Sequence, residues 1–187
     1  MELWDIYDHH RNPTGQTHQR GTPLGKNACH LVTQVWIVNS RGDILLTQRH
    51  PDKTYGRMWE CTGGAVQAGE DTYTASLREV CEEIGVDLSQ DRPILVRRDN
   101  YTSGNTFCDI WLYHKDVDLA KTTLQSDEVI GIRWVSYREF LRMVEAGEAI
   151  HSLIYFKEIY HKYCKDPAFY ADSFSGYYLH SCNVTGQ

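Results

Sequence analysis

The pattern of hydrophobic and polar positions predicts strands and helices in succession along the chain. Runs rich in β-branched and aromatic residues, bounded by turn-forming residues, are typical of strands. Five such runs follow one another: His30–Val38, residues 43–49, residues 94–98, Thr106–His114 and Val129–Val135. Apolar residues three and four apart, which mark one face of a helix, recur in three segments: Thr72–Ile84, residues 137–146 and residues 152–164. This order predicts an α/β (α+β) fold.

The two ends of the chain carry different signals. Leu3–Tyr7 and residues 15–18 flank the turn-like stretch His10-Arg11-Asn12-Pro13-Thr14, which predicts an N-terminal hairpin. The last twenty or so residues are rich in Tyr, Ser and Gly and predict an irregular extension. With no repeat and no linker, we expect one domain over residues 1–187: a hairpin-like extension (1–29), a core (30–165) and a C-terminal extension (166–187).

The predicted helix Thr72–Ile84 has defined ends and two opposed faces. Asp71 or Thr72 can cap its first free amides, and Gly85 can stop it in the left-handed conformation. One face carries an apolar stripe and the opposite face is acidic. The stripe is Leu77, Val80, Cys81 and Ile84, and the acids are Glu79, Glu82 and Glu83. We therefore expect the stripe in the core and the acids on the solvent-facing side.

Three glutamates on one helix face need a counter-charge. Like charges three or four residues apart repel by a few tenths of a kcal/mol, on the order of 0.3 for each pair. A divalent cation is the natural counter-charge, because carboxylate oxygens are ligands that Mg²⁺ prefers.

The segment that contains these acids resembles a known motif. Residues 64–86, called the box segment below, read G-x5-E-x7-R-E-U-x-E-E-x-G-U, where U is aliphatic. This pattern resembles the Nudix box of hydrolases that cleave a nucleoside diphosphate linked to another group. The resemblance implies a loop–helix–loop that holds Mg²⁺ or Mn²⁺ against a diphosphate. It also implies a Nudix-type α/β/α sandwich with a mixed sheet, over about residues 30–145.

The resemblance assigns roles residue by residue. Glu79, Glu82 and Glu83 would be metal ligands, and Gly64 would let the backbone approach the metal. Glu79, Arg78 and Glu82 are the expected catalytic residues. Arg78 would orient Glu79 by pairing with it, and Glu79 is the preferred general base. The metal would lower the pKa of a bound water that attacks phosphorus.

Further candidates flank the helix. Glu70 would play a supporting role near the metal. Arg49 ends a strand just before the box segment and could contact substrate phosphate; otherwise it is a surface strand residue. Glu128 could be an additional metal ligand or the base; otherwise it is a solvated loop acid. Trp36 and Trp59 are expected in the core.

Two other functions compete with hydrolysis. The opening Glu2-Leu3-Trp4-Asp5-Ile6-Tyr7-Asp8, with Thr17-His18-Gln19-Arg20-Gly21, is similar to isopentenyl-diphosphate isomerase-like proteins. True isomerases use a cysteine just before a degenerate box. Here Gly63 stands at that place, Cys61 lies two residues away and the box is complete, so hydrolysis is favoured. A non-catalytic diphosphate sensor is the other alternative, although the chain has no appended DNA-binding helix pair or basic arm.

Composition limits the partners. The chain has 187 residues, 41% hydrophobic content and a net charge of −6, so it has no global attraction for nucleic acid or anionic membranes. It shows neither a signal peptide nor a membrane span, which predicts a cytoplasmic protein. The expected partner is a small-molecule diphosphate substrate, with a homodimer expected by analogy.

The six cysteines do not predict a metal or disulfide framework. They stand at positions 29, 61, 81, 108, 164 and 182, without a C-x-x-C pair. Without a secretory signal we expect most of them to be reduced core residues. Cys29-His30 has no second ligand pair at zinc spacing.

Overall fold

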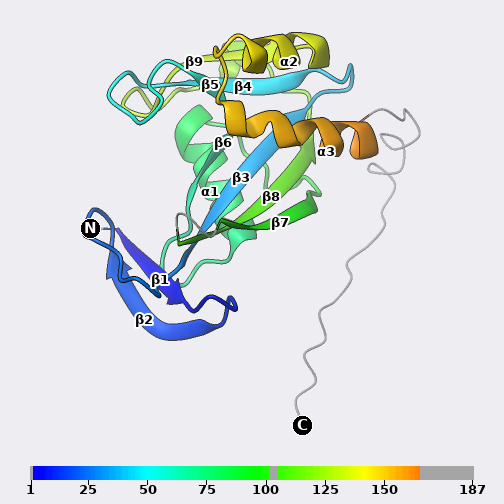
Figure 1. Ribbon diagram of the computed structural model, residues 1–187. Coiled ribbons are helices and arrows are strands. Elements are labelled where there is room, and N and C mark those ends of the chain that lie inside the picture. The colour runs from blue at the N-terminus through cyan, green and yellow to red at the C-terminus, as the bar shows by residue number, and fades with distance from the viewer. Residues whose placement is uncertain (1, 102–104, 165–187) are drawn as a thin grey trace.

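The computed structural model describes residues 2–101 and 105–164. Its strands are β1 Leu3–Tyr7, β2 Pro13–Gln19, β3 His30–Val38, β4 Ile44–Arg49, β5 Trp59–Glu60, β6 Thr62–Ala65, β7 Ile94–Tyr101, β8 Thr106–His114 and β9 Val129–Val135. Its helices are α1 Thr72–Ile84, α2 Tyr137–Glu145 and α3 Phe156–Tyr163, with 3₁₀ turns η1 Leu119–Lys121 and η2 His151–Tyr155 (Figure 1). None of the helices in these ranges is long and apolar enough to cross a membrane.

The main sheet is mixed, as the resemblance implies. Its strands lie in the order β5-β4-β3-β8-β7, while β6 also pairs with β3 and β9 pairs with β4. Strands β3 and β8 run parallel, from His30 opposite Thr106 to Val38 opposite His114. The other pairs in this sheet are antiparallel. Strand β3 therefore lies at the centre of the molecule.

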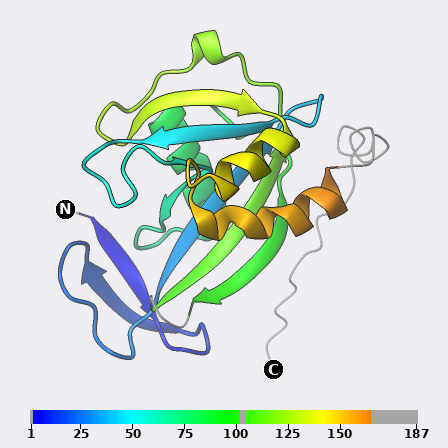
Figure 2. The ribbon, with the colours of Figure 1, turned by 45° about the horizontal axis from the view of Figure 1, so that its top comes forward.

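Helices cover both faces of the sheet, which confirms the α/β/α sandwich. Figure 2 shows α2 and α3 in front of β3 and β8, with α1 behind them. On the α2–α3 face, Trp36 is fully buried and stacks on Phe156 with ring centroids 3.7 Å apart. On the α1 face, Val35 and Ile37 pack with Val80 and Ile84. Because side chains alternate along a strand, β3 contributes to both cores.

Most predicted elements are confirmed, with shifted ends at some of them. Strand β7 continues three residues beyond the predicted 94–98, because its pairing with β8 extends to Thr106. Residues 152–164 are not one helix: 3₁₀ turn η2 precedes α3. Residues 59–65, which lead into the box segment, form β5 and β6. The sequence did not predict these two short strands. Trp36 is in the core as expected, whereas Trp59 is half-buried at its edge.

Helix α1 lies rotated from the orientation that its apolar stripe predicts. Val80 and Ile84 are buried as expected, but Cys81 is exposed, so its predicted core position was wrong. The other buried positions are Thr72, Ala75 and Ser76. Their small side chains let the first half of the helix approach the sheet closely. The buried face is thereby displaced by about a quarter turn toward the acidic positions.

This rotation changes the position of two acids. The side chain of Glu79 is only 14% exposed, whereas that of Glu82 is 50% exposed. Glu83 is also half-buried. The expectation that all three acids face solvent was therefore wrong for Glu79 and Glu83. They lie where the helix meets the sheet, and only Glu82 is on the open side.

The N-terminal hairpin is confirmed and packs against the box segment. Strands β1 and β2 form a separate antiparallel pair, which extends from the main body in Figure 1. The Leu3 carbonyl accepts a bond from the Ala68 amide at 2.8 Å, and the Asp5 carboxylate accepts one from the Gly69 amide at 2.7 Å. These bonds attach the hairpin to the loop that precedes α1.

The predicted extension over residues 166–187 lies outside the described residues, as does Cys182. Among the other cysteines, Cys61, Cys108 and Cys164 are buried as expected, and Cys29 is half-buried.

Candidate active site

The ends of α1 fix where the acidic residues lie. The Asp71 side chain accepts a bond from the Thr74 amide at 2.7 Å, which caps the first turn as predicted. Gly85 ends the helix with φ 69°, a left-handed value that glycine adopts without steric cost. In addition, the Thr72 hydroxyl donates to the buried Asp109 carboxylate of β8 at 2.7 Å. The helix is thus held at its first turn and stopped directly after Ile84.

Arg78 connects three glutamates and the loop before the helix. Its guanidinium donates to Glu70 through Nε and Nη2, at 2.8 and 3.0 Å. Nη1 donates to Glu79 at 2.8 Å and to Glu82 at 3.1 Å. Nη2 also donates to the Ala65 carbonyl at 3.0 Å. Although burial alone would raise the pKa of Glu70, the bonds from Arg78 and the Gln67 amide lower it.

Glu79 lies directly against Gly64 of β6. A Cβ atom placed on Gly64 would lie 2.4 Å from the Glu79 carboxylate carbon, well inside van der Waals contact. Burial raises the pKa of Glu79, and the nearby Glu82 charge adds to the effect, while Arg78 opposes it. The carboxylate therefore fits only because position 64 has no side chain.

Glu83 stands in the most acidic environment of the site. Burial raises the pKa of its carboxyl well above the usual range, and the charges of Glu79, Glu60 and Glu128 raise it further. The pKa of Glu60 is likewise raised by burial, although its bond from Arg49 opposes the shift. A buried carboxylate among other carboxylates requires either a proton or a positive partner.

A cavity of about 290 Å³ opens beside these carboxylates. Two cations on its wall are already paired: Arg49 bonds to Glu60 at 2.5 Å and to the Thr54 carbonyl at 2.6 Å, and Lys53 pairs with Glu128. This space is called the site cavity below. It is lined by Arg20, Val32, Thr33, Gln34, Arg49, Lys53, Glu60, Cys61, Gly63, Gly64, Ala65, Glu83 and Glu128.

The residues fit a hard divalent cation by their chemistry. The donors at hand are carboxylates, which suit Mg²⁺ and Mn²⁺. The half-buried carboxyl of Glu83, surrounded by the charges of Glu79, Glu60 and Glu128, favours a cation at this place. Across residues 2–101 and 105–164, no three His, Cys, Asp or Glu side chains already converge as a cation cage. Glu79 and Glu82 instead both bond to Arg78.

The structure brings most predicted site residues together. Gly64, Glu83, Arg49 and Glu128 line the site cavity. Glu79 lies against Gly64, and the bonds of Arg78 link Glu79, Glu82 and Glu70 into one group. Sequence reasoning missed five polar residues of the cavity wall: Arg20, Thr33, Gln34, Lys53 and Glu60. Arg20 stands in the stretch that is similar to isomerase-like proteins, but no role was predicted for it, and the other four belong to no motif.

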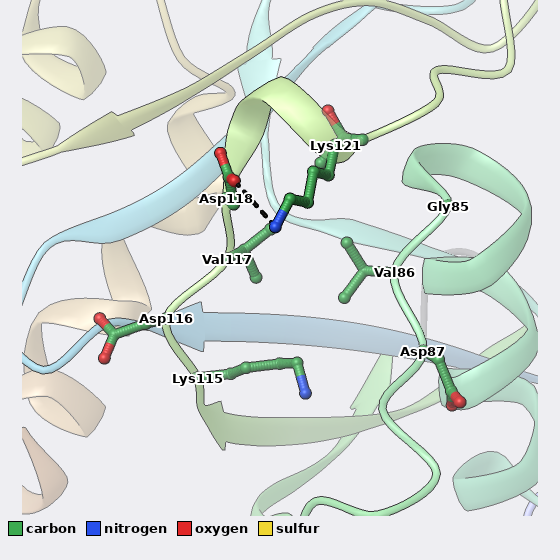
Figure 3. A pocket seen from close by; sticks show the side chains of 9 residues that line it. Gly85, Val86, Asp87, Lys115, Asp116, Val117, Asp118 and Lys121 are labelled. Atoms are coloured by element: carbon green, nitrogen blue, oxygen red, sulfur yellow. Dashed lines mark ion pairs between the residues drawn. The ribbon is translucent and has the colours of Figure 1, made fainter.

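A second hollow lies on another part of the surface. Figure 3 shows it between the residues that follow α1 and the segment from Lys115 to Thr122, with Lys121 paired to Asp118 at 3.5 Å. None of the candidate catalytic or metal-binding residues lines it.

Solved structures share this fold. The DR0079 protein of Deinococcus radiodurans superposes with a TM-score of 0.67 at 22% identity, covering 79% of this chain and 91% of that protein. A MutT protein of Methanosarcina mazei superposes with a TM-score of 0.57 at 23% identity, over 73% and 95% of the two chains. At these identities the likeness concerns the fold alone.

Sequence relatives extend the comparison to the family. An uncharacterised Nudix hydrolase of Listeria monocytogenes is 37% identical over 154 residues, which cover 80% of this chain and 89% of the relative. An isopentenyl-diphosphate Delta-isomerase of Escherichia coli is 25% identical over 146 residues, or 72% and 76% of the two chains. The family model of the NUDIX domain matches residues 30–155. The chain therefore belongs to the NUDIX family, and it is a hydrolase of that family, acting on a substrate that contains a diphosphate.

Proposed function

We propose that this hydrolase cleaves the phosphoanhydride of a nucleoside diphosphate derivative with the help of Mg²⁺ or Mn²⁺. The observation that carries the proposal is the position of Glu83. Its half-buried carboxyl group lines the site cavity together with Glu60 and Glu128, and when ionised it needs a positive partner there. A divalent cation supplies that charge and a means to bind phosphate.

Each residue has a distinct part in this proposal. Glu79, Glu82 and Glu83 hold the metal, with Gly64 leaving room for the Glu79 carboxylate. Arg78 holds Glu79 and Glu82 in place, and Glu70 in turn fixes Arg78 from the other side. Arg49 and Lys53, which line the cavity, face the negative charge of the substrate phosphates.

The proposed reaction is attack of water on phosphorus. When bound, the metal shields phosphate charge and lowers the pKa of the attacking water. Glu79 accepts the proton of this water, and burial, which raises the pKa of its carboxyl, makes it a stronger base. Glu128 is the alternative base, since it also lines the cavity.

Isomerisation of a prenyl diphosphate is the second candidate function. Cys61 lines the site cavity, and the Escherichia coli isomerase is among the relatives. Burial raises the pKa of the Cys61 thiol well above its usual range, however, so it stays protonated. Gly63 occupies the position where the resemblance would require a cysteine, so hydrolysis is preferred.

A panel of diphosphate compounds tests the proposal. Nucleoside triphosphates, nucleotide sugars, dinucleotide cofactors and isopentenyl diphosphate are each incubated with Mg²⁺, with Mn²⁺ and with EDTA. Metal-dependent release of phosphate, diphosphate or a nucleoside monophosphate supports hydrolysis. Interconversion of the C5 diphosphates would instead indicate an isomerase, and tight binding without turnover would indicate a sensor. A homodimer, the absence of nucleic-acid binding and a cytoplasmic location remain predictions from the sequence.

A further inference from the structure

Gln34 is a polar residue in the wall of the site cavity, on the central strand. It lies on β3 directly opposite Gly63 of β6, one residue from the pair formed by Thr33 and Gly64. Its side chain is half-buried and lines the site cavity. A neutral amide on the central strand is therefore close to the place where the proposed substrate binds.

The orientation of this amide is set by a chain of hydrogen bonds. The indole Nε1–H of Trp36 donates to the Tyr155 hydroxyl at 3.0 Å, and this hydroxyl lies 2.5 Å from Gln34 Oε1. An indole can only donate, so the phenol oxygen accepts from Trp36. The phenol donates its proton to Gln34 Oε1, so the amide presents its carbonyl oxygen to Tyr155.

The opposite end of the amide is consequently a hydrogen-bond donor. Within the described residues, the Gln34 amide nitrogen donates to no protein acceptor, so its two N–H groups are the part left for a ligand. A glutamine that could flip would present either a donor or an acceptor to the cavity. The bond from Tyr155 removes that ambiguity.

Tyr155 is itself held in place by contacts with two strands of the sheet. It belongs to η2, and its ring stands edge-on to the buried ring of Trp36 with centroids 6.2 Å apart. The guanidinium carbon of Arg97, from β7, lies 5.2 Å from the centre of the Tyr155 ring. These contacts fix the phenol before any ligand arrives.

We propose that Gln34 determines specificity by donating a hydrogen bond to a neutral acceptor on the group attached to the diphosphate, and that Tyr155 is its positioning residue. The inference rests on the proposed function. Arg49 and Lys53 supply charge for the phosphates, whereas a neutral amide suits a carbonyl, hydroxyl or ring nitrogen. A nucleoside carries such acceptors and a prenyl chain carries none. The group attached to the diphosphate is therefore expected to carry such an acceptor.

Three variants test the inference. Gln34→Met keeps the size of the side chain but removes its amide. Tyr155→Phe keeps the ring but frees the amide to flip. Tyr160→Phe is the matched control, because the Tyr160 hydroxyl of α3 donates to the Gly42 carbonyl at 2.9 Å, on a residue that does not line the cavity. Thermal melting of all three variants checks that they fold. If Gln34→Met does not fold, Gln34→Asn replaces it, because the shorter side chain withdraws the amide from the cavity.

The measured quantities are kcat and KM for ADP-ribose, NADH, UDP-glucose, diadenosine tetraphosphate, dGTP and isopentenyl diphosphate, and the inhibition constant of inorganic pyrophosphate. For the nucleoside compound that the wild type cleaves fastest, Gln34→Met should raise KM by about tenfold. Tyr155→Phe should raise it by about threefold, with kcat nearly unchanged in both. The inhibition constant of pyrophosphate, which lacks the attached group, should stay unchanged, as should every parameter of Tyr160→Phe.

Two results would overturn the inference while the proposed function stands: an unchanged KM in Gln34→Met, or a wild type that cleaves isopentenyl diphosphate in preference to every nucleoside compound. A wild type that cleaves none of the compounds would instead remove the proposed function, and the inference with it.

Discussion

The carboxylate of Glu79 occupies the space that a side chain on Gly64 would need. A Cβ atom at position 64 would lie between 2.4 and 2.5 Å from the three carboxylate atoms of Glu79. Gly64 is on β6 and Glu79 is on α1, so this contact sets how closely the helix of the box segment approaches the strand before it. A glycine is thus required here by packing against the side chain of the proposed base, Glu79.

Gly64→Ala should displace Glu79 and abolish most of the hydrolysis. A displacement of about 1 Å at a catalytic group can reduce the rate by about a hundredfold. Circular dichroism should show an intact fold, because the carboxylate can turn away toward solvent. Gly25→Ala is the control, since its nearest neighbour, Ala28 Cβ, would be 3.9 Å away. Near wild-type turnover by Gly64→Ala would mean that Glu79 has no role in the reaction.

Arg78→Ala should reduce kcat by about 10- to 100-fold by releasing Glu79 and Glu82 from their present positions. Arg78→Lys should restore little of the lost kcat. An ammonium group cannot replace the planar guanidinium, which bonds to Glu70 and Glu79 at the same time.

Arg142→Ala is the matched control for Arg78. On the exposed side of α2, Arg142 also bonds to two glutamates, Glu139 and Glu148, each at 2.8 Å. Its loss should leave the kinetics unchanged. Equal effects of the two substitutions would show that Arg78 has no specific role.

Glu83→Gln should lower turnover by about two orders of magnitude or more, because the proposed metal ligand is lost. The pKa of Glu83 is raised in the folded state. Its ionisation therefore opposes folding once the pH exceeds the pKa that Glu83 has in the unfolded chain. Glutamine removes that charge, and the melting temperature in EDTA should therefore stay constant or rise.

The metal itself can be followed by melting the same proteins with increasing Mg²⁺ or Mn²⁺. A ligand that binds only the folded state raises its stability with concentration. The wild type and the exposed control Glu158→Gln should show this rise, and Glu83→Gln should show a much smaller one. A full metal response in Glu83→Gln would exclude Glu83 as a ligand.

The sequence predicted the local elements of the site better than their mutual placement. The ends of α1 follow from Asp71 and Gly85, which act through their own backbone neighbours. The rotation of α1 does not follow from its apolar stripe. Ala75 and Ser76 are buried because their small side chains let the helix approach the sheet closely, and neither is strongly hydrophobic. Cys81 was misplaced for the same reason.

The contacts across the cavity wall could not be predicted, because their partners meet only through the tertiary fold. Lys53 and Glu128 lie 75 positions apart in the sequence, and Gln34 and Tyr155 lie 121 apart. Neither pair belongs to a periodic pattern or a short motif. Their contacts depend on the pairing of β4 with β9 and on the packing of η2 against β3.

Lys53→Met should weaken substrate binding more than the chemical step. It removes a cation from the cavity wall and leaves Glu128 without its partner, so KM should rise by about tenfold or more. Lys121→Met serves as the control, because Lys121 is paired in the distant hollow of Figure 3. A loss of kcat at unchanged KM would instead assign Lys53 to the chemical step.

We expect His114 to lower the stability of the protein at acidic pH. It ends β8, both of its ring nitrogens are buried, and burial lowers its pKa from 6.5 to about 4. A depressed folded-state pKa means that the unfolded chain takes up the proton first. The contribution of His114 to the free energy of unfolding is therefore complete above about pH 6.5 and is lost as the pH falls toward 4. At about 1.4 kcal/mol for each pH unit, the loss is roughly 3 kcal/mol at most.

Urea unfolding at a series of pH values between 7.5 and 4 measures this loss in the wild type and in His114→Gln. The glutamine cannot take up a proton, so the two free energies of unfolding should converge as the pH falls, since the wild type loses stability that the variant does not. His9→Gln, in the exposed turn of the hairpin, should follow the wild type. Parallel curves for the wild type and His114→Gln would show that His114 does not cause the acid sensitivity, and that other groups do.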